Sequence, residues 1–256
     1  MMRFEAGQAD GLMRLLLDIG EMLLNSCAEV NRVEDTITRL GKAYGAERMD
    51  VFVITSSIVV TMSFPEGLEL TRTRRILTTG ATDFSRLEAL NALSRRCCRE
   101  PIPLSQLRDE LEKLRSDRSG RALFYLGSVL AAGGCAVFFG GTALDGLASA
   151  LFALLIVAMQ QALGDICPNN VVYNLLISFV SGMAICAAGR ALPALNADKI
   201  MIGDIMLLIP GMIMTNSVRN ILVGDTIYGL MRLIESLLWA GALACGFMAA
   251  IWLIGG

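Results

Sequence analysis

The first part of the chain has the alternation of apolar and polar positions expected of a folded domain. From Gly11 to Tyr44, apolar residues recur every three or four positions, which predicts two amphipathic helices separated near residues 27–29. The next stretch, MDVFVITSSIVVTMSFPEGLELTRTRR, is rich in β-branched residues and contains a Pro-Glu-Gly turn. It therefore predicts two or three antiparallel strands packed on helices.

Two more helices are predicted before the pattern changes. Asp83 occupies an N-cap position before FSRLEALNALSRRCCR, and LSQLRDELEKLRSDR follows the break at residues 101–103. We expect an α+β domain over residues 1–120.

The second part of the chain consists of long apolar stretches. There are 23 uncharged residues between Arg121 and Asp145, 19 between Asp145 and Asp165, and 24 between Asp165 and Arg190. Each stretch is long enough to cross a hydrocarbon core of about 30 Å at about 1.5 Å per residue. We expect an α-helical polytopic bundle over residues 121–256, with about five transmembrane helices near residues 122–140, 146–164, 171–188, 200–217 and 227–254.

The distribution of charge supports this division and orients the chain. Of the 22 Lys and Arg residues, 17 precede Arg121, as do 18 of the 24 Asp and Glu residues. Arg115 and Arg118 lie just before the first apolar stretch, so the positive-inside rule predicts that the N-terminal domain is cytoplasmic. We expect a multi-pass protein of the plasma (inner) membrane. No cleaved leader is expected, because charged residues interrupt the apolar positions of the N-terminal helix.

Composition excludes several kinds of chemistry. The chain has no histidine, and its seven cysteines show no metal-type spacing, so we expect no metal site and no cofactor. The sequence also lacks a phosphate-binding glycine loop and a nucleophile elbow. We therefore expect no enzyme and no nucleic-acid partner.

The segment from Gly203 to Leu238 combines a helix breaker with polar groups at membrane depth. Pro210 and Gly211 should kink or break the fourth span, and irregular backbone in a membrane is tolerated where it lines a cavity. A plain proline kink is the alternative. Charges at membrane depth cost at least about 2.5 kcal/mol each, so they usually face the bundle interior or water. The candidate substrate or ion pathway therefore comprises Asp204, Pro210, Gly211, Asn216, Arg219, Asp225, Arg232 and Glu235.

Some members of this set have a simpler explanation. Arg219 and Arg232 could be interfacial anchors whose side chains reach the cytoplasm. Arg232 and Glu235 are three positions apart, so they share a helix face and could pair. Asp204 lies within a predicted span, whereas Asp145 and Asp165 lie at span edges and are typical of helix ends.

The sequence resembles the threonine/serine exporter family over nearly its whole length. The resemblance rests on LLIPG at residues 207–211, NSVRN at 216–220 and GDTIYGLMR at 224–232, followed by Glu235. GEMLLNSCAEVNRVEDTITRLGKAYG and TRTRR resemble the soluble part of the family. Family members often have an aspartate where this chain has Asn220, so Asp225 or Asp204 would have to carry a proton.

The resemblance implies a secondary exporter of small amino acids, driven by the proton-motive force. It implies that this chain is the large subunit of a split transporter with a separate small membrane subunit. A zwitterionic substrate would use an arginine for its carboxylate and an acidic residue for its ammonium. The alternatives are a dicarboxylate exporter, which would depend on Arg219, Arg232 and the TRTRR strand, and a non-transporting membrane sensor or scaffold.

Overall fold

The computed structural model describes residues 6–54, 57–65, 67–76, 83–116, 121–164, 167 and 169–255. The described chain forms two compact units. Unit 1 comprises Met1–Arg118 and Thr215–Arg232, and unit 2 comprises Ser119–Met214 and Leu233–Gly256. The sequence predicted a single boundary at residue 120. In the structure, the later segment Thr215–Arg232 also belongs to the N-terminal unit. Glu66, Arg118 and Asp165 lie outside the described residues.

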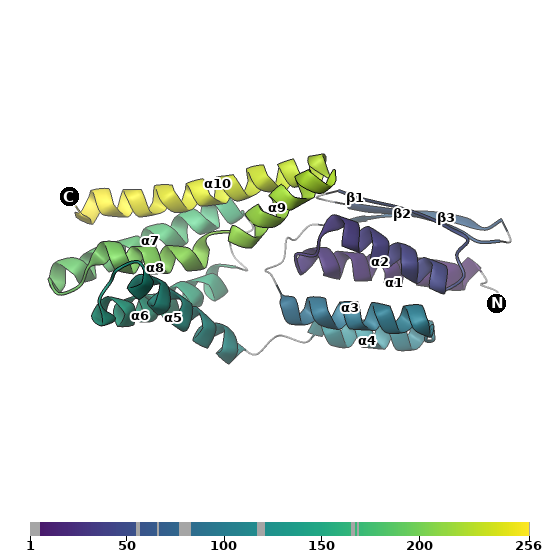
Figure 1. The fold of residues 1–256 in the computed structure, drawn as a ribbon, viewed down its shortest axis with the longest axis horizontal. Coiled ribbons are helices and arrows are strands. Elements are labelled where there is room, and N and C mark those ends of the chain that lie inside the picture. Colours follow the sequence, from purple (N-terminus) through teal and green to yellow (C-terminus); the bar gives the residue numbers. More distant parts are fainter. Residues whose placement is uncertain are drawn as a thin grey trace. The chain divides into compact units, whose positions relative to one another are not determined.

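Unit 1 contains a three-stranded sheet and two layers of helices (Figure 1). In chain order its elements are α1 (Ala6–Asn25), α2 (Val30–Ala43), β1 (Arg48–Ile54), β2 (Ser57–Ser63), β3 (Glu69–Arg75), α3 (Phe84–Arg99) and α4 (Leu104–Ser116). The predicted helix pair, strands and N-cap are confirmed: the strands pair antiparallel in the order β1-β2-β3, and Asp83 Oδ1 accepts a hydrogen bond from Arg86 N at 2.9 Å. Gly67, at φ +80°, closes the turn between β2 and β3.

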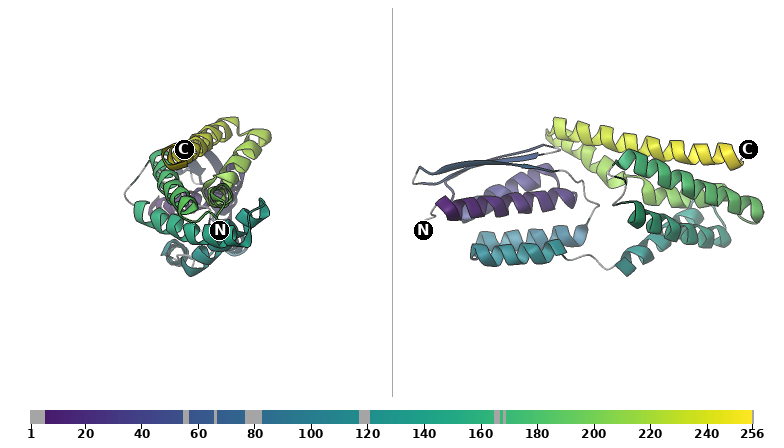
Figure 2. Two further views of the ribbon diagram at one scale, coloured as in Figure 1. Left: turned by 90° about the vertical axis from the view of Figure 1, so that its left-hand side faces the viewer. Right: turned by 180° about the vertical axis from the view of Figure 1, so that it is seen from behind.

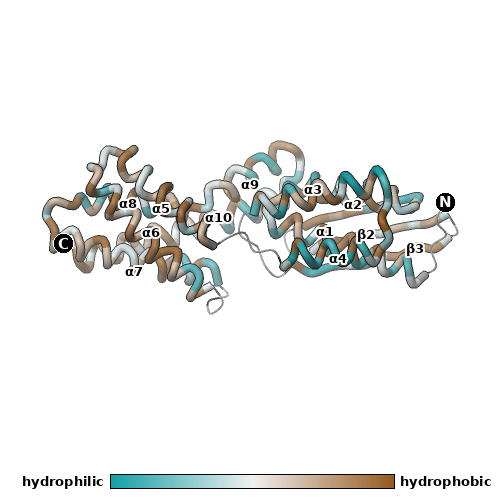
Figure 3. The backbone as a smooth tube through the Cα atoms, turned by 90° about the horizontal axis from the view of Figure 1, so that it is seen from below, coloured by the Kyte–Doolittle hydropathy of each residue, from teal (hydrophilic) through white to brown (hydrophobic). Residues whose placement is uncertain are grey.

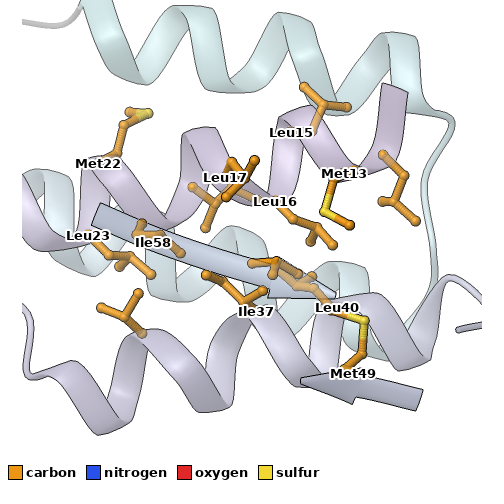
Figure 4. Close-up of a cluster of buried hydrophobic side chains, with 14 of the residues drawn as sticks. Met13, Leu15, Leu16, Leu17, Met22, Leu23, Ile37, Leu40, Met49 and Ile58 are labelled. Carbon is orange, nitrogen blue, oxygen red and sulfur yellow. The ribbon is translucent and has the colours of Figure 1, made fainter. Parts of the chain in front are cut away.

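Helix α1 lies between the sheet and the outer helices of unit 1, as the right-hand view of Figure 2 shows. This position explains why its sequence is apolar on more than one face, since Leu12, Leu15, Leu16 and Leu17 are all buried. Figure 4 shows side chains of α1, among them Leu16 and Leu23, beside Ile37 of α2 and Ile58 of β2. The core of unit 1 is therefore centred on α1.

Unit 2 is a bundle of apolar helices, which are brown along most of their length in Figure 3. Its elements are α5 (Arg121–Phe138), α6 (Ala143–Leu163), α7 (Asn170–Ala191), α8 (Ala197–Leu208), the start of α9 (Gly211–Val223), most of α10 (Thr226–Ala250) and a π-helical turn (Ile251–Gly255). Large apolar side chains are exposed on its surface, among them Phe138 and Trp252, each with 82% of its surface exposed. In contrast, Ser149, Ser178 and Asp204 are fully buried. An apolar exterior around buried polar groups is the arrangement of an integral membrane protein.

The helix lengths support most of the predicted spans. Within the described residues, Ala143–Leu163, Asn170–Ala191 and Thr226–Ile254 are long and apolar enough to cross a membrane. The predicted span at 200–217 is a bent pair, Ala197–Leu208 and Gly211–Val223, which would supply a fourth crossing. The apolar helix Ala122–Phe138 is shorter than these spans, so the described residues contain three or four candidate spans, whereas the sequence predicts about five.

Candidate functional site

The best candidate for a functional group within the membrane is Asp204. It lies on α8, has no exposed surface, and its Oδ1 accepts a hydrogen bond from Ser149 Oγ of α6 at 2.9 Å. Its second oxygen, Oδ2, is buried and has no hydrogen-bond partner among the described residues. Buried carboxyl groups usually have their hydrogen bonds satisfied, so an open acceptor at this depth indicates a place for a proton or a cationic group.

Close helix packing holds Asp204 in this position. A Cβ atom at the neighbouring Gly203 would lie 2.6 Å from the backbone oxygen of Ala132 and 2.6 Å from Ser149 Oγ. Helices α5, α6 and α8 can approach this closely only because Gly203 has no side chain. The glycine therefore brings Ser149 within hydrogen-bonding distance of Asp204.

The predicted break of the fourth span is confirmed. Helix α8 ends at Leu208, Ile209 is extended, and α9 begins at Gly211 after a bend of 51°. The residue before a proline avoids helical geometry, which explains the end of α8. A side chain at Gly211 would meet no atom within 4 Å, so close packing does not explain this glycine.

A second group of predicted residues lies within unit 1. Arg219 of α9 forms an ion pair with Glu29, with Nη1 and Oε1 2.7 Å apart. Glu29 is the N-cap residue of α2. The contact joins α9 to the N-terminus of α2 and pairs the Arg219 guanidinium group with a carboxylate.

Asp225 lies near another carboxyl group of unit 1. Glu34 of α2 accepts a hydrogen bond from Val53 N at 3.0 Å. Burial raises the pKa of the Glu34 carboxyl above its ordinary value, the bond from Val53 opposes this shift, and the charge of Asp225 adds to it. Asp225 Oδ2 is buried without a hydrogen-bond partner among the described residues. This pair of acids has an acceptor available for a proton or a cation.

The first turns of α10 complete the core of unit 1. Tyr228 is 9% exposed and belongs to the same apolar cluster as the side chains of α1. The guanidinium carbon of Arg232 lies 5.7 Å from the centroid of the Tyr228 ring, and Arg232 Nε is 3.4 Å from the Tyr228 hydroxyl oxygen. Arg232 is therefore positioned by an aromatic contact.

The predicted pathway residues thus divide between the two units. Asn216, Arg219, Asp225 and Arg232 belong to unit 1, whereas Asp204, Pro210, Gly211 and Glu235 belong to unit 2. Within unit 1, Arg219 contacts Glu29 and Asp225 lies near Glu34; within unit 2, Asp204 contacts Ser149. Glu29, Glu34 and Ser149 were not predicted as partners, because a single sequence carries no signal that pairs residues so far apart along the chain.

Asp145 has a structural explanation, as its position at a helix end predicted. It lies in the first turn of α6 and forms a capping box with Thr142. Its Oδ1 accepts a hydrogen bond from Asn196 N at 2.7 Å, and its Oδ2 accepts one from Asn196 Nδ2 at 2.9 Å. These bonds join the start of α6 to the loop before α8. Among the described residues, no group of acidic or cysteine side chains could hold a metal ion.

Comparisons with known proteins agree with the sequence resemblance. The family model ThrE, described as "Putative threonine/serine exporter", matches residues 14–254. A "Threonine/serine exporter" of Corynebacterium glutamicum is 23% identical over 248 residues, which cover 93% of this chain. The chain spans about half (50%) of the length of that curated relative. No solved structure matches the chain.

Proposed function

Because this chain belongs to the threonine/serine exporter family, we propose that it is the large membrane subunit of a secondary exporter of threonine and serine. The proton-motive force drives export in this proposal. Unit 1, including the parts of α9 and α10 that pack into it, is cytoplasmic in this proposal, and α5 provides a fifth crossing. The observation that carries the proposal is Asp204, a fully buried carboxyl group with one open acceptor inside an apolar bundle.

Asp204 is the proposed binding group for a proton or for the ammonium of the substrate. Its only described hydrogen-bond donor is the neutral hydroxyl of Ser149, so no cation of unit 2 that the structure describes already compensates it. A transported proton or ammonium group would supply the missing positive charge. The break at Pro210 and Gly211, on the same segment, is the proposed flexible point of the pathway.

A dicarboxylate substrate is less well supported by the contacts of unit 1. Arg74 of the TRTRR strand lies 2.8 Å from Asp18 and 2.8 Å from Glu21, and Arg72 forms an ion pair with Asp10. These arginines already neutralise acidic residues of α1. Arg219 is similarly paired with Glu29. An exporter of dianions would need arginines that are available to its substrate.

The separate small membrane subunit and the substrate are tested together. Proteoliposomes that contain this chain, with and without a candidate small subunit, are loaded with unlabelled threonine or with unlabelled succinate. The counterflow of labelled threonine into the first set is compared with the counterflow of labelled succinate into the second. Threonine counterflow supports the proposal. Succinate counterflow alone would favour the dicarboxylate alternative, and no flux of either would favour a sensor or scaffold.

Two of the predicted pathway residues in unit 1 are tested in the same assay. Asp225→Asn and Arg232→Gln should abolish threonine counterflow while the protein is expressed at normal levels. Retained counterflow in both variants would remove these residues from the pathway.

A further inference from the structure

Unit 1 contains a cavity between two helices that the proposed transport function does not use. Its volume is about 470 Å³, and helices α2 and α3 supply its walls. Cavities of this size accommodate small-molecule ligands.

Four arginines line this cavity. Arg32 and Arg39 lie two turns apart on α2, and Arg95 and Arg99 lie one turn apart on α3. These spacings place each pair on one face of its own helix. The cavity walls are therefore strongly basic.

Most of this positive charge is not neutralised by the protein. Arg39 Nε lies 2.7 Å from Asp35 Oδ1, which pairs one of the four arginines. Across the described parts of the chain, no carboxylate forms an ion pair with Arg32, Arg95 or Arg99. The neighbouring Arg96, in contrast, is paired with Glu110 of α4. Burial raises the pKa of Cys98, so its thiol adds no negative charge to the cavity.

We propose that this cavity binds a small anion that carries a diphosphate or two phosphate groups. Guanidinium groups bind phosphate oxygens through two parallel hydrogen bonds. A phosphate monoester carries about 1.5 to 2 negative charges at neutral pH, so two phosphate groups balance three unpaired arginines. Asn91 and Thr36 add neutral hydrogen-bonding groups at the wall. None of the lining residues that the structure describes is aromatic, so we expect the site to recognise the phosphate groups of its ligand and not to stack a base.

This binding site gives unit 1 a role as a receptor for a phosphate-bearing ligand. The same chemistry is present in a soluble metabolite and in the headgroup of an anionic lipid. The inference does not depend on the transported substrate, because it rests on unit 1 alone and its test measures binding.

The test uses the full-length chain in nanodiscs of phosphatidylcholine, with inorganic pyrophosphate as the probe in calorimetric titrations. We expect saturable binding that weakens as salt is added. The double variant Arg32→Gln with Arg99→Gln should weaken binding at least about tenfold, because each charge-assisted bond contributes roughly that factor. Absence of saturable pyrophosphate binding would overturn the proposal.

A matched double variant controls for net charge. Arg48→Gln with Arg75→Gln removes the same charge from exposed positions of β1 and β3, outside the cavity. This control should change the affinity less than about twofold, as expected of distant surface charges. An equal loss in both double variants would show nonspecific attraction and contradict the proposal.

Nanodiscs that contain cardiolipin, whose headgroup carries two phosphate groups, distinguish the two ligand sources. If the lipid headgroup occupies the site, these nanodiscs should weaken pyrophosphate binding to the wild type, and the cavity variant should lose the lipid dependence. Unchanged pyrophosphate binding would identify a soluble ligand. Both results support the site, and thermal unfolding of each variant shows whether it is folded.

Discussion

Ser149 of α6 donates a hydrogen bond to Asp204 of α8 across 2.9 Å, between two residues with no exposed surface. The two residues are 55 positions apart in the sequence. This single bond leaves the other carboxylate oxygen of Asp204 open. The arrangement combines a fixed carboxyl group with an available acceptor, which is what binding of a transported cation requires.

Asp204→Asn should abolish threonine counterflow without reducing expression. The amide keeps the size of the side chain but loses its negative charge, so neither a proton nor an ammonium group would be held. Asp198→Asn, at an exposed position in the first turn of the same helix, is the matched control and should retain transport. Full transport by Asp204→Asn would exclude Asp204 from the pathway.

Ser149→Ala should reduce transport to a smaller extent. It removes one hydrogen bond to the carboxylate, worth about 1.5 to 3 kcal/mol when one partner is charged, but keeps the charge itself. Initial rates of counterflow at several threonine concentrations would measure the change. A loss as complete as that of Asp204→Asn would instead indicate that Ser149 contacts the substrate directly.

Gly203→Ala should destabilise unit 2. The added methyl group would lie 2.6 Å from the backbone oxygen of Ala132, which can move only with its helix. Overpacking of this kind typically costs about 1 to 3 kcal/mol. Gly241→Ala on α10 is the control, since its Cβ would meet no atom within 4 Å. Thermal unfolding in detergent should show a lower midpoint for Gly203→Ala only, and equal midpoints would contradict the packing argument.

A double-mutant cycle on Arg219 and Glu29 should give a small coupling energy, no more than about 1 kcal/mol. The arginine side chain is 59% exposed, so solvent screens the pair. If Arg219 is an anchor, Arg219→Gln and Glu29→Gln should leave the KM for threonine unchanged. A raised KM in Arg219→Gln alone would identify Arg219 as a substrate ligand.

Glu34 should make the stability of unit 1 depend on pH. Because burial raises its pKa in the folded state, the folded protein binds more protons than the unfolded chain above the ordinary pKa of a carboxyl group. Its contribution to stability is therefore present at lower pH and is lost as the pH rises through the raised pKa. Glu34→Gln keeps the oxygen that accepts from Val53 N and removes the charge near Asp225.

This variant should be more stable than the wild type at neutral pH, and the difference should vanish in acid. Thermal midpoints in detergent between pH 4 and 8 would measure the effect. Glu47→Gln, at an exposed position, is the control and should not change the pH dependence. A difference that persists in acid would show that charge is not its cause.

The sequence by itself determined the local features of this protein. The three-to-four-residue period of α1 and α2, the β-branched strands, the Asp83 cap and the end of α8 before Pro210 were predicted, because each depends on neighbouring residues along the chain. The long uncharged stretches identified a membrane protein for the same reason. The resemblance in residues 207–235 identified the family, which the family model confirmed.

Only the tertiary structure decided which charges meet. The sequence placed Arg219, Asp225 and Arg232 in one polar segment with Asp204, but the fold assigns the first three to unit 1 and Asp204 to unit 2. Pairing with Glu29 and a position near Glu34 depend on the packing of α2, which is almost two hundred residues earlier in the chain. Likewise, the arginines of α2 and α3 have the sequence spacing of ordinary solvated helices. Only the packing of the two helices places these arginines at one cavity. Side-chain electrostatics depends on distances in space, and a pattern along one chain does not determine those distances.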